Sequence, residues 1–147
     1  MRVTCICTGN TCRSPMAAAL LDMLLKTRGR RDITVQSAGL AADGSPAADN
    51  AVAAMAELGV DISDHRSRPL TQELFLNTDR LLVMSPAHRQ LLLQAGAREE
   101  QVVILGGGIP DPYGGPLAVY IATRDRLSDA LEAWLDTSPE EEDHGKI

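Results

Sequence analysis

The chain has 147 residues, of which 44% are hydrophobic and 23% charged, and its net charge is −6. This size and composition are those of one globular domain with a substantial core, and the acidic balance argues against nucleic acid as a partner. No apolar run approaches the length of a membrane span, and the first two residues lead into an apolar segment without a signal peptide. We therefore expect a cytoplasmic protein that binds neither nucleic acid nor a membrane.

The first predicted elements are a strand and a helix joined by a short loop. Residues 3–7 form an apolar, β-favouring run that is typical of a buried strand. Pro15 stands where a helix begins, and hydrophobic residues then recur at helical spacing. The loop between them reads Cys7-Thr-Gly-Asn-Thr-Cys-Arg-Ser-Pro15, so five residues separate a cysteine from an arginine.

This loop has the features of an anion-binding site. Backbone N–H groups from Thr8 to Arg13 can turn inward, and the N-terminus of the following helix adds the positive end of its dipole. Gly9 and Asn10 tolerate the positive φ of a tight loop, and the Arg13 guanidinium can bind two phosphate oxygens. The same field favours the ionised form of a thiol, so we expect Cys7 to be a thiolate that faces bound phosphorus. A nucleotide-binding loop ending in Gly-Lys-Ser/Thr is not matched.

The rest of the chain alternates between strand-like and helical segments, which predicts a parallel sheet with helices on both faces. Further strands are expected at residues 33–37, 80–84 and 102–105, and helices at 48–56, 71–76, 86–95 and 117–136. The predicted fold is α/β, a single three-layer domain with a four-stranded parallel sheet and flavodoxin-like doubly wound topology. We expect this domain to cover residues 1–137 and to be followed by an acidic, frayed tail at 138–147.

Asp111 is the candidate general acid. Ligands of such sheets bind beyond the carboxyl ends of the strands, where the loops after the first and fourth predicted strands both lie. Asp111 lies in the second of these loops between Pro110 and Pro112, which would stiffen it. A departing oxygen or nitrogen needs a proton as its bond to phosphorus breaks, and ionised Asp111 could then activate water. The alternative is a turn-forming Asp-Pro without a chemical role.

The segment from Cys7 to Pro15 resembles the signature of the low-molecular-weight protein tyrosine phosphatase family. Thr11 makes it most similar to the bacterial protein-arginine-phosphatase branch, and Asp111-Pro-Tyr-Gly-Gly resembles the family's acid loop. The resemblance implies a cysteine-dependent phosphoprotein phosphatase that forms a phosphocysteine and needs no metal or other cofactor. Its substrate would be a phosphorylated protein, and inorganic phosphate or sulfate would compete as anions.

The resemblance also implies roles for the residues around the nucleophile. The phosphate-binding set is the loop itself: Thr8, Gly9, Asn10, Thr11, Cys12, Arg13 and Ser14. Asn10, Ser37 and His65 match side chains that hold the loop open by hydrogen bonds, although His65 could also be a solvated histidine. Ser14 matches the hydroxyl that stabilises the thiolate as it leaves. Cys12 would close reversibly on Cys7 under oxidation and protect the nucleophile.

The remaining cysteines and histidines receive less specific predictions. The three cysteines all lie within the first twelve residues and cannot form a disulfide framework. A metal site at these cysteines would need a fourth ligand of uncertain origin, so Cys5 is expected to be a small buried core residue. His88 and His144 have no evident partner and are expected at the surface. Arg66 and Arg68 either extend the anion-binding surface or are solvated.

The substrate preference depends on Thr11 and Tyr113. Tyrosine phosphatases of the resembled family commonly carry two consecutive aromatic residues after Asp-Pro, whereas Tyr113 is followed here by Gly114. Stacking on a phenol ring would therefore be weaker, and the Thr11 hydroxyl suits a polar guanidinium. Phosphoarginine is slightly favoured over phosphotyrosine. The alternatives are arsenate reduction, which needs resolving cysteines that do not occur after Cys12, and a non-catalytic phosphate- or phosphoprotein-binding module.

Overall fold

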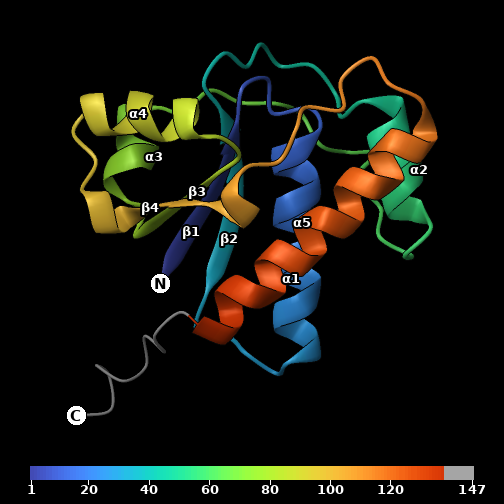
Figure 1. The fold of residues 1–147 in the computed structure, drawn as a ribbon, viewed down its shortest axis with the longest axis horizontal. Coiled ribbons are helices and arrows are strands. Elements are labelled where there is room, and N and C mark those ends of the chain that lie inside the picture. Colours follow the sequence, from blue (N-terminus) through green and yellow to red (C-terminus); the bar gives the residue numbers. More distant parts are fainter. Residues whose placement is uncertain (138–147) are drawn as a thin grey trace.

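The computed structural model describes residues 1–137. Its centre is a parallel sheet of β1 (Arg2–Cys7), β2 (Thr34–Gly39), β3 (Arg80–Val83) and β4 (Val102–Ile104), in the spatial order β2-β1-β3-β4 (Figure 1). The predicted four-stranded, doubly wound sheet is confirmed. The acidic segment expected at 138–147, including His144, lies outside the described residues.

Helices cover both faces of the sheet (Figure 1). One face carries α1 (Arg13–Thr27), α2 (Asp49–Ala56) and α5 (Leu117–Thr137), and the other carries α3 (Gln72–Leu76) and α4 (Pro86–Gln94). Two short 3-10 helices, η1 (Glu99–Gln101) and η2 (Leu105–Gly107), flank β4. The structure therefore has the three predicted layers, with helices on the two sides of one sheet.

The alternation of side chains along β1 divides the core into two clusters, because successive strand residues point to opposite faces. Val3, Cys5 and Cys7 belong to the larger cluster beneath α1, α2 and α5. Ile6 belongs to the smaller cluster with residues of β3, β4 and α4, among them Leu92. Cys7 is thus at the carboxyl end of a buried strand and on the α1 side of the sheet.

The second strand is longer than the sequence predicts. Ala38 and Gly39 continue β2, where Gly39 pairs with Cys7 at the last position of the register. Ala38 is fully buried, and the N–H of Leu40 donates to the carbonyl of Cys7 at 3.0 Å. The end of β2 is therefore held directly against the start of the loop that follows β1.

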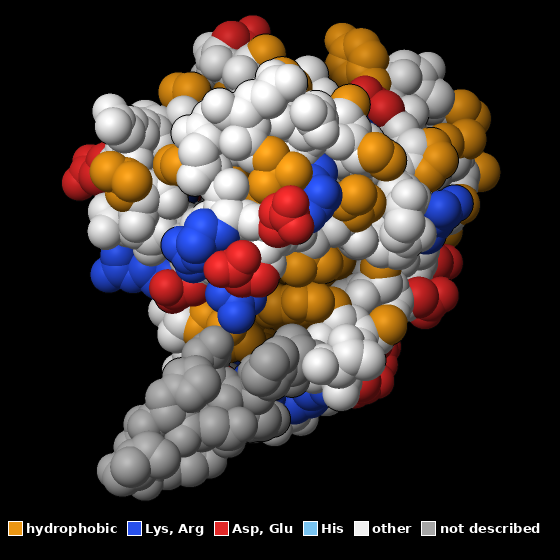
Figure 2. Space-filling view, turned by 60° about the vertical axis from the view of Figure 1, so that its left-hand side comes forward, with side chains coloured by type: hydrophobic (Ala, Val, Ile, Leu, Met, Phe, Trp, Pro, Cys, Tyr) orange, Lys and Arg blue, Asp and Glu red, His pale blue; other side chains and the backbone are white. Residues whose placement is uncertain are grey.

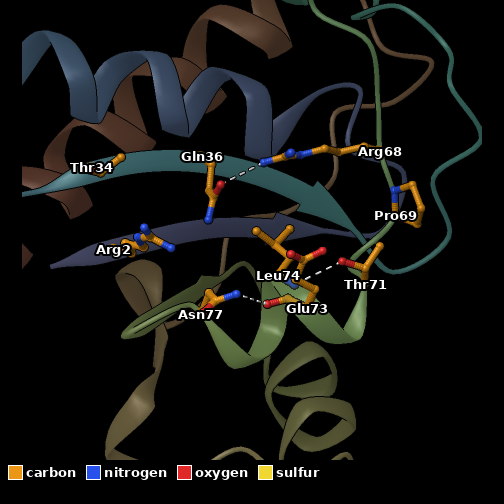
Figure 3. Close-up of a pocket in the computed structure, with 9 residues that line it drawn as sticks. All are labelled: Arg2, Thr34, Gln36, Arg68, Pro69, Thr71, Glu73, Leu74 and Asn77. Atoms are coloured by element: carbon orange, nitrogen blue, oxygen red, sulfur yellow. Dashed lines mark hydrogen bonds between the residues drawn. The ribbon is translucent and has the colours of Figure 1, made fainter.

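A cleft of about 480 Å³ lies between strands β1 and β2 and the α3 segment, and Figure 3 shows its lining residues. Arg68 lies along this cleft, with Nε donating to the carbonyl of Ser37 and Nη2 to Oε1 of Gln36, both at 3.0 Å. Arg68 is exposed, as one of its two predicted roles requires, but its guanidinium is also hydrogen-bonded to β2. Its side chain anchors the segment after α2 to strand β2.

The molecular surface carries mixed charge on the face drawn in Figure 2, where acidic and basic side chains lie among hydrophobic ones. Within residues 1–137, none of the helices combines the length and the apolar character needed to cross a membrane.

Candidate active site

The candidate nucleophile, Cys7, lies at the bottom of the loop between β1 and α1. Its side chain is buried, and its sulfur accepts backbone N–H groups from Asn10 at 3.3 Å and Ser14 at 3.4 Å. The Ser14 hydroxyl lies 3.0 Å from the same sulfur. Three hydrogen-bonding groups therefore surround the sulfur.

The direction of the Ser14 hydroxyl proton follows from its neighbours. Asn10 Nδ2, which can only donate, lies 2.6 Å from Ser14 Oγ, so the hydroxyl oxygen accepts there. The proton can then go to Cys7 at 3.0 Å or to the carbonyl of Ala38 at 3.5 Å. The shorter contact is with the sulfur, so the arrangement favours donation from Ser14 to Cys7.

Asn10 organises the loop through every polar group that it has. It adopts a left-handed conformation with φ of 57°, which asparagine tolerates better than most residues. Its carbonyl lies 2.7 Å from Nε2 of His65, and its Oδ1 accepts the backbone N–H of Arg68 at 3.0 Å. Its Nδ2 also donates to Ser37 Oγ at 3.1 Å. The supporting residues expected from the sequence thus converge on one asparagine behind the cavity.

Arg13 and Asp111 are far apart in the sequence but lie close together at the cavity. Arg13 is 6% exposed, and its Nη1 donates to the carbonyl of Ile109 at 2.9 Å. Its Nη2 lies 3.7 Å from Oδ2 of Asp111, whose side chain is 52% exposed. Among the side-chain atoms of residues 1–137, Arg13 Nε is a buried donor without a hydrogen-bond partner. Because buried donors are nearly always paired, this N–H is available to an oxygen of a bound anion.

The resulting cavity has a volume of about 200 Å³. It is lined by residues of the β1–α1 loop and of the loop before α5: Cys7, Thr8, Gly9, Thr11, Cys12, Arg13, Asp111 and Tyr113. The two loops come together at the upper edge of the sheet in Figure 1. Within residues 1–137, no group of three or more His, Cys, Asp or Glu side chains is arranged to hold a metal ion.

The prediction that His88 lies at the surface is wrong. His88 is 6% exposed, and its Nδ1 accepts the backbone N–H of Met84 at 3.3 Å. Its Nε2 lies 3.0 Å from Oγ1 of Thr8, a residue that lines the cavity. Burial, and to a smaller extent the Arg13 charge, lowers the pKa of His88, so the ring is held neutral. His88 is in the first turn of α4, after the capping residue Ser85, and this places its ring beside the carboxyl edge of β3.

Two further neighbours of the loop were not predicted. The Tyr120 hydroxyl, in the buried face of α5, lies 3.4 Å from the sulfur of Cys12. Burial raises the pKa of the Cys12 thiol, and the hydrogen bond with Tyr120 opposes that rise. A Cβ added to Gly39 would lie only 2.8 Å from the carbonyl oxygen of Thr8. The sequence predicts a role for Ser37, two residues earlier, but not this close approach of Gly39 to the loop.

The role expected for Cys5 is confirmed. Cys5 is fully buried in the core, and this burial raises the pKa of its thiol to about 12. It is therefore a protonated core side chain. Cys7 and Cys12 are both free thiols in the structure.

Comparison with known proteins identifies the class. A family model described as low molecular weight phosphotyrosine protein phosphatase matches residues 2–144. A protein-arginine-phosphatase from Bacillus subtilis is 37% identical over 89% of this chain and 92% of the relative. A probable low molecular weight protein-tyrosine-phosphatase, EpsP, from Ralstonia nicotianae is 38% identical over 88% of this chain and 90% of its own length.

Solved structures agree with this result. A crystal structure of a YwlE mutant from Bacillus subtilis superposes with a TM-score of 0.85 at 34% identity, covering 92% of this chain and 97% of that one. A cysteine-to-serine mutant of the YwlE arginine phosphatase with a phosphorylated active-site serine gives a TM-score of 0.84 at 33% identity, covering 94% and 97%. The protein is an enzyme, a low-molecular-weight protein phosphatase. It belongs to the low molecular weight phosphotyrosine protein phosphatase family.

Proposed function

We propose that this enzyme hydrolyses phosphoarginine side chains of proteins, with Cys7 as nucleophile and Asp111 as general acid. The proposal rests on one cavity that contains both Cys7 and Arg13. The Cys7 sulfur accepts two backbone N–H groups, and within residues 1–137 the buried Nε–H of Arg13 has no hydrogen-bond partner. The relative with a phosphorylated serine in place of its active-site cysteine supports a phosphoryl-enzyme at this position.

In the first step, the sulfur of Cys7 attacks phosphorus as the bond from phosphorus to the substrate nitrogen breaks. Arg13 and the loop N–H groups bind the phosphoryl oxygens and stabilise the charge that they carry in the transition state. Protonated Asp111 transfers its proton to the departing nitrogen, so that the guanidine leaves as a stable product. The products of this step are the arginine side chain and a phosphocysteine at Cys7.

In the second step, water attacks the phosphorus of the phosphocysteine. Asp111, now a carboxylate, accepts a proton from that water, and the bond between sulfur and phosphorus breaks. Cys7 leaves as a thiolate, which the Ser14 hydroxyl at 3.0 Å and the two backbone N–H groups stabilise. Inorganic phosphate is released, and Asp111 is again protonated.

Phosphoarginine is favoured over phosphotyrosine by the side chains at the cavity mouth. Tyr113 is the one aromatic side chain among the described lining residues, and it is 76% exposed. Thr11 also lines the cavity and offers a hydroxyl in place of an apolar surface. Phosphotyrosine remains the second candidate because Tyr113 can still stack on a phenol ring, and because tyrosine phosphatases occur among the relatives.

The catalytic roles are tested with two substitutions. Cys7→Ser should abolish turnover of p-nitrophenyl phosphate while inorganic phosphate still binds in calorimetry, since the loop N–H groups and Arg13 remain. Asp111→Asn should lower kcat/KM, which reports the step in which the leaving group departs, by about 10²-fold or more on a phosphoarginine peptide. The loss should be smaller on p-nitrophenyl phosphate, whose leaving group needs less help from an acid. Turnover by Cys7→Ser, or an equal loss on both substrates, would contradict the assignments.

The substrate preference is tested by measuring kcat/KM on phosphoarginine and phosphotyrosine peptides of the same sequence. Wild type should prefer phosphoarginine, and Thr11→Ile should shift the ratio toward phosphotyrosine by about 10-fold, the effect of about 1.4 kcal/mol of differential binding. Thr11→Ser, which keeps the hydroxyl, is the matched control and should retain the preference. An unchanged ratio in Thr11→Ile would remove Thr11 from the selectivity argument.

A further inference from the structure

His88 is a buried histidine whose two ring nitrogens both have partners. Nδ1 lies 3.3 Å from the backbone nitrogen of Met84, and Nε2 lies 3.0 Å from Oγ1 of Thr8. The backbone N–H of Met84 can only donate, so Nδ1 must accept with its lone pair. In a neutral ring the proton is then on Nε2, which donates to the Thr8 hydroxyl.

This tautomer determines what the Thr8 hydroxyl can do. Its oxygen accepts from His88, so its own proton must be donated elsewhere. Thr8 directly follows Cys7 and lines the cavity that also contains Arg13. Within residues 1–137, the hydrogen bond with His88 is the only one that this hydroxyl makes, so a phosphoryl oxygen can accept its proton.

We infer that His88 is a positioning residue, which fixes the Thr8 hydroxyl as a donor to an oxygen of the bound phosphoryl group. The inference rests on the proposed phosphate-binding role of the loop. The Thr8 hydroxyl would then bind the phosphoryl group together with the backbone N–H groups and Arg13. Its orientation would depend on α4, which carries His88 and lies on the opposite face of the sheet from α1. A purely structural His88 would instead act only by capping the end of β3 through Met84.

The two roles of His88 are separated by a pair of amide substitutions. Glutamine places a side-chain N–H about as far from Cβ as Nε2, so His88→Gln keeps a donor for Thr8. Asparagine reaches only as far as Nδ1, so His88→Asn keeps an acceptor for Met84 and loses the bond to Thr8. We expect His88→Asn to weaken inorganic phosphate binding in calorimetry and to lower kcat/KM by about 3- to 10-fold, as for one hydrogen bond. We expect His88→Gln to stay within about twofold of wild type for both quantities.

Thr8→Val provides the second arm of the experiment. It removes the hydroxyl at nearly constant volume, and in this background the difference between His88→Asn and His88→Gln should disappear. If that difference persists, or if the two His88 variants lose phosphate affinity equally, His88 does not act through Thr8 and the inference is wrong.

Nitrogen NMR of the wild-type protein tests the tautomer without any variant that must fold. His88 should be neutral near pH 7 with its proton on Nε2; a proton on Nδ1 would overturn the inference. The result is also distinguishable from a failure of the proposed function. If wild type binds phosphate with the expected dependence on His88 but turns over no substrate, the catalytic proposal fails and the positioning role stands.

Discussion

Gly39→Ala should displace the phosphate-binding loop between β1 and α1, although Gly39 does not itself line the cavity. An added Cβ would lie 2.8 Å from the Thr8 carbonyl oxygen, 2.9 Å from Asn10 Cβ and 3.0 Å from Asn10 N. Two of these three are backbone atoms, which cannot swing away as the end of a side chain could. Gly39 cannot retreat either, because its N–H donates to Arg68 and its carbonyl accepts from Leu70. The loop must therefore move by a few tenths of an ångström.

The cost of Gly39→Ala follows from this displacement. Overpacking of this kind destabilises by about 1–3 kcal/mol. Since a misplacement of about 1 Å can reduce catalysis about 10²-fold, a shift of a few tenths should lower kcat/KM by about 10-fold. Thermal unfolding and steady-state hydrolysis of p-nitrophenyl phosphate measure the two effects.

Gly29→Ala is the matched control for this prediction. Gly29 has φ of 69°, and no atom of residues 1–137 lies within 4 Å of an added Cβ; it follows the C-terminal end of α1, away from the cavity. Alanine there should cost about 1–2 kcal/mol through backbone strain alone, with unchanged kcat/KM. Wild-type kcat/KM in Gly39→Ala would refute the reasoning, because the loop would then not be held against β2.

Two further predictions concern stability. Arg124 joins α5 to α2 by donating to the carbonyl of Ala54 at 2.9 Å and to Glu57 at 2.8 Å. Arg124→Met should lower the free energy of unfolding in urea by about 1–2 kcal/mol, since the half-exposed carboxylate of Glu57 is screened, and kcat/KM should not change. Burial lowers the pKa of His88, so the unfolded chain binds more protons as the pH falls below the unfolded value of about 6.5. Stability should therefore decline below about pH 6.5 in wild type, and less so in His88→Gln; equal declines would contradict a neutral, buried His88.

The sheet and the loop could be predicted because their signals are local in the sequence. The apolar run of residues 3–7, the change to helical spacing after Pro15 and the alternation of segments each depend on near neighbours. The place of Asp111 followed from topology alone, since loops at the carboxyl ends of parallel strands share an edge. The structure brings Asp111 to 3.7 Å from Arg13, a proximity of the kind that this rule predicts.

His88 and Gly39 escaped prediction because their importance depends on distances that the sequence does not contain. His88 contacts Thr8 across 80 positions, and only the turn from β3 into α4 directs its ring toward the loop. Without that geometry, a histidine in the first turn of a helix resembles any solvated one. The predicted second strand ends at Ser37, before Gly39, whose lack of a side chain is needed where β2 passes beneath Asn10.

The predicted supports His65 and Ser37, together with His88, explain how the loop keeps its shape. Asn10 is held by His65 and by the backbone of Arg68, both from the segment before α3, and by Ser37 from β2, while His88 holds Thr8 from α4. An anion that enters such a loop finds its donors already oriented, so little of its binding energy is lost in ordering them. Asp111 differs, because its side chain is half exposed and its Oδ1 accepts only a local backbone N–H from Tyr113. Under the proposed mechanism this contrast is useful: the phosphoryl group needs a fixed site, whereas the acid must serve first the departing group and then the incoming water.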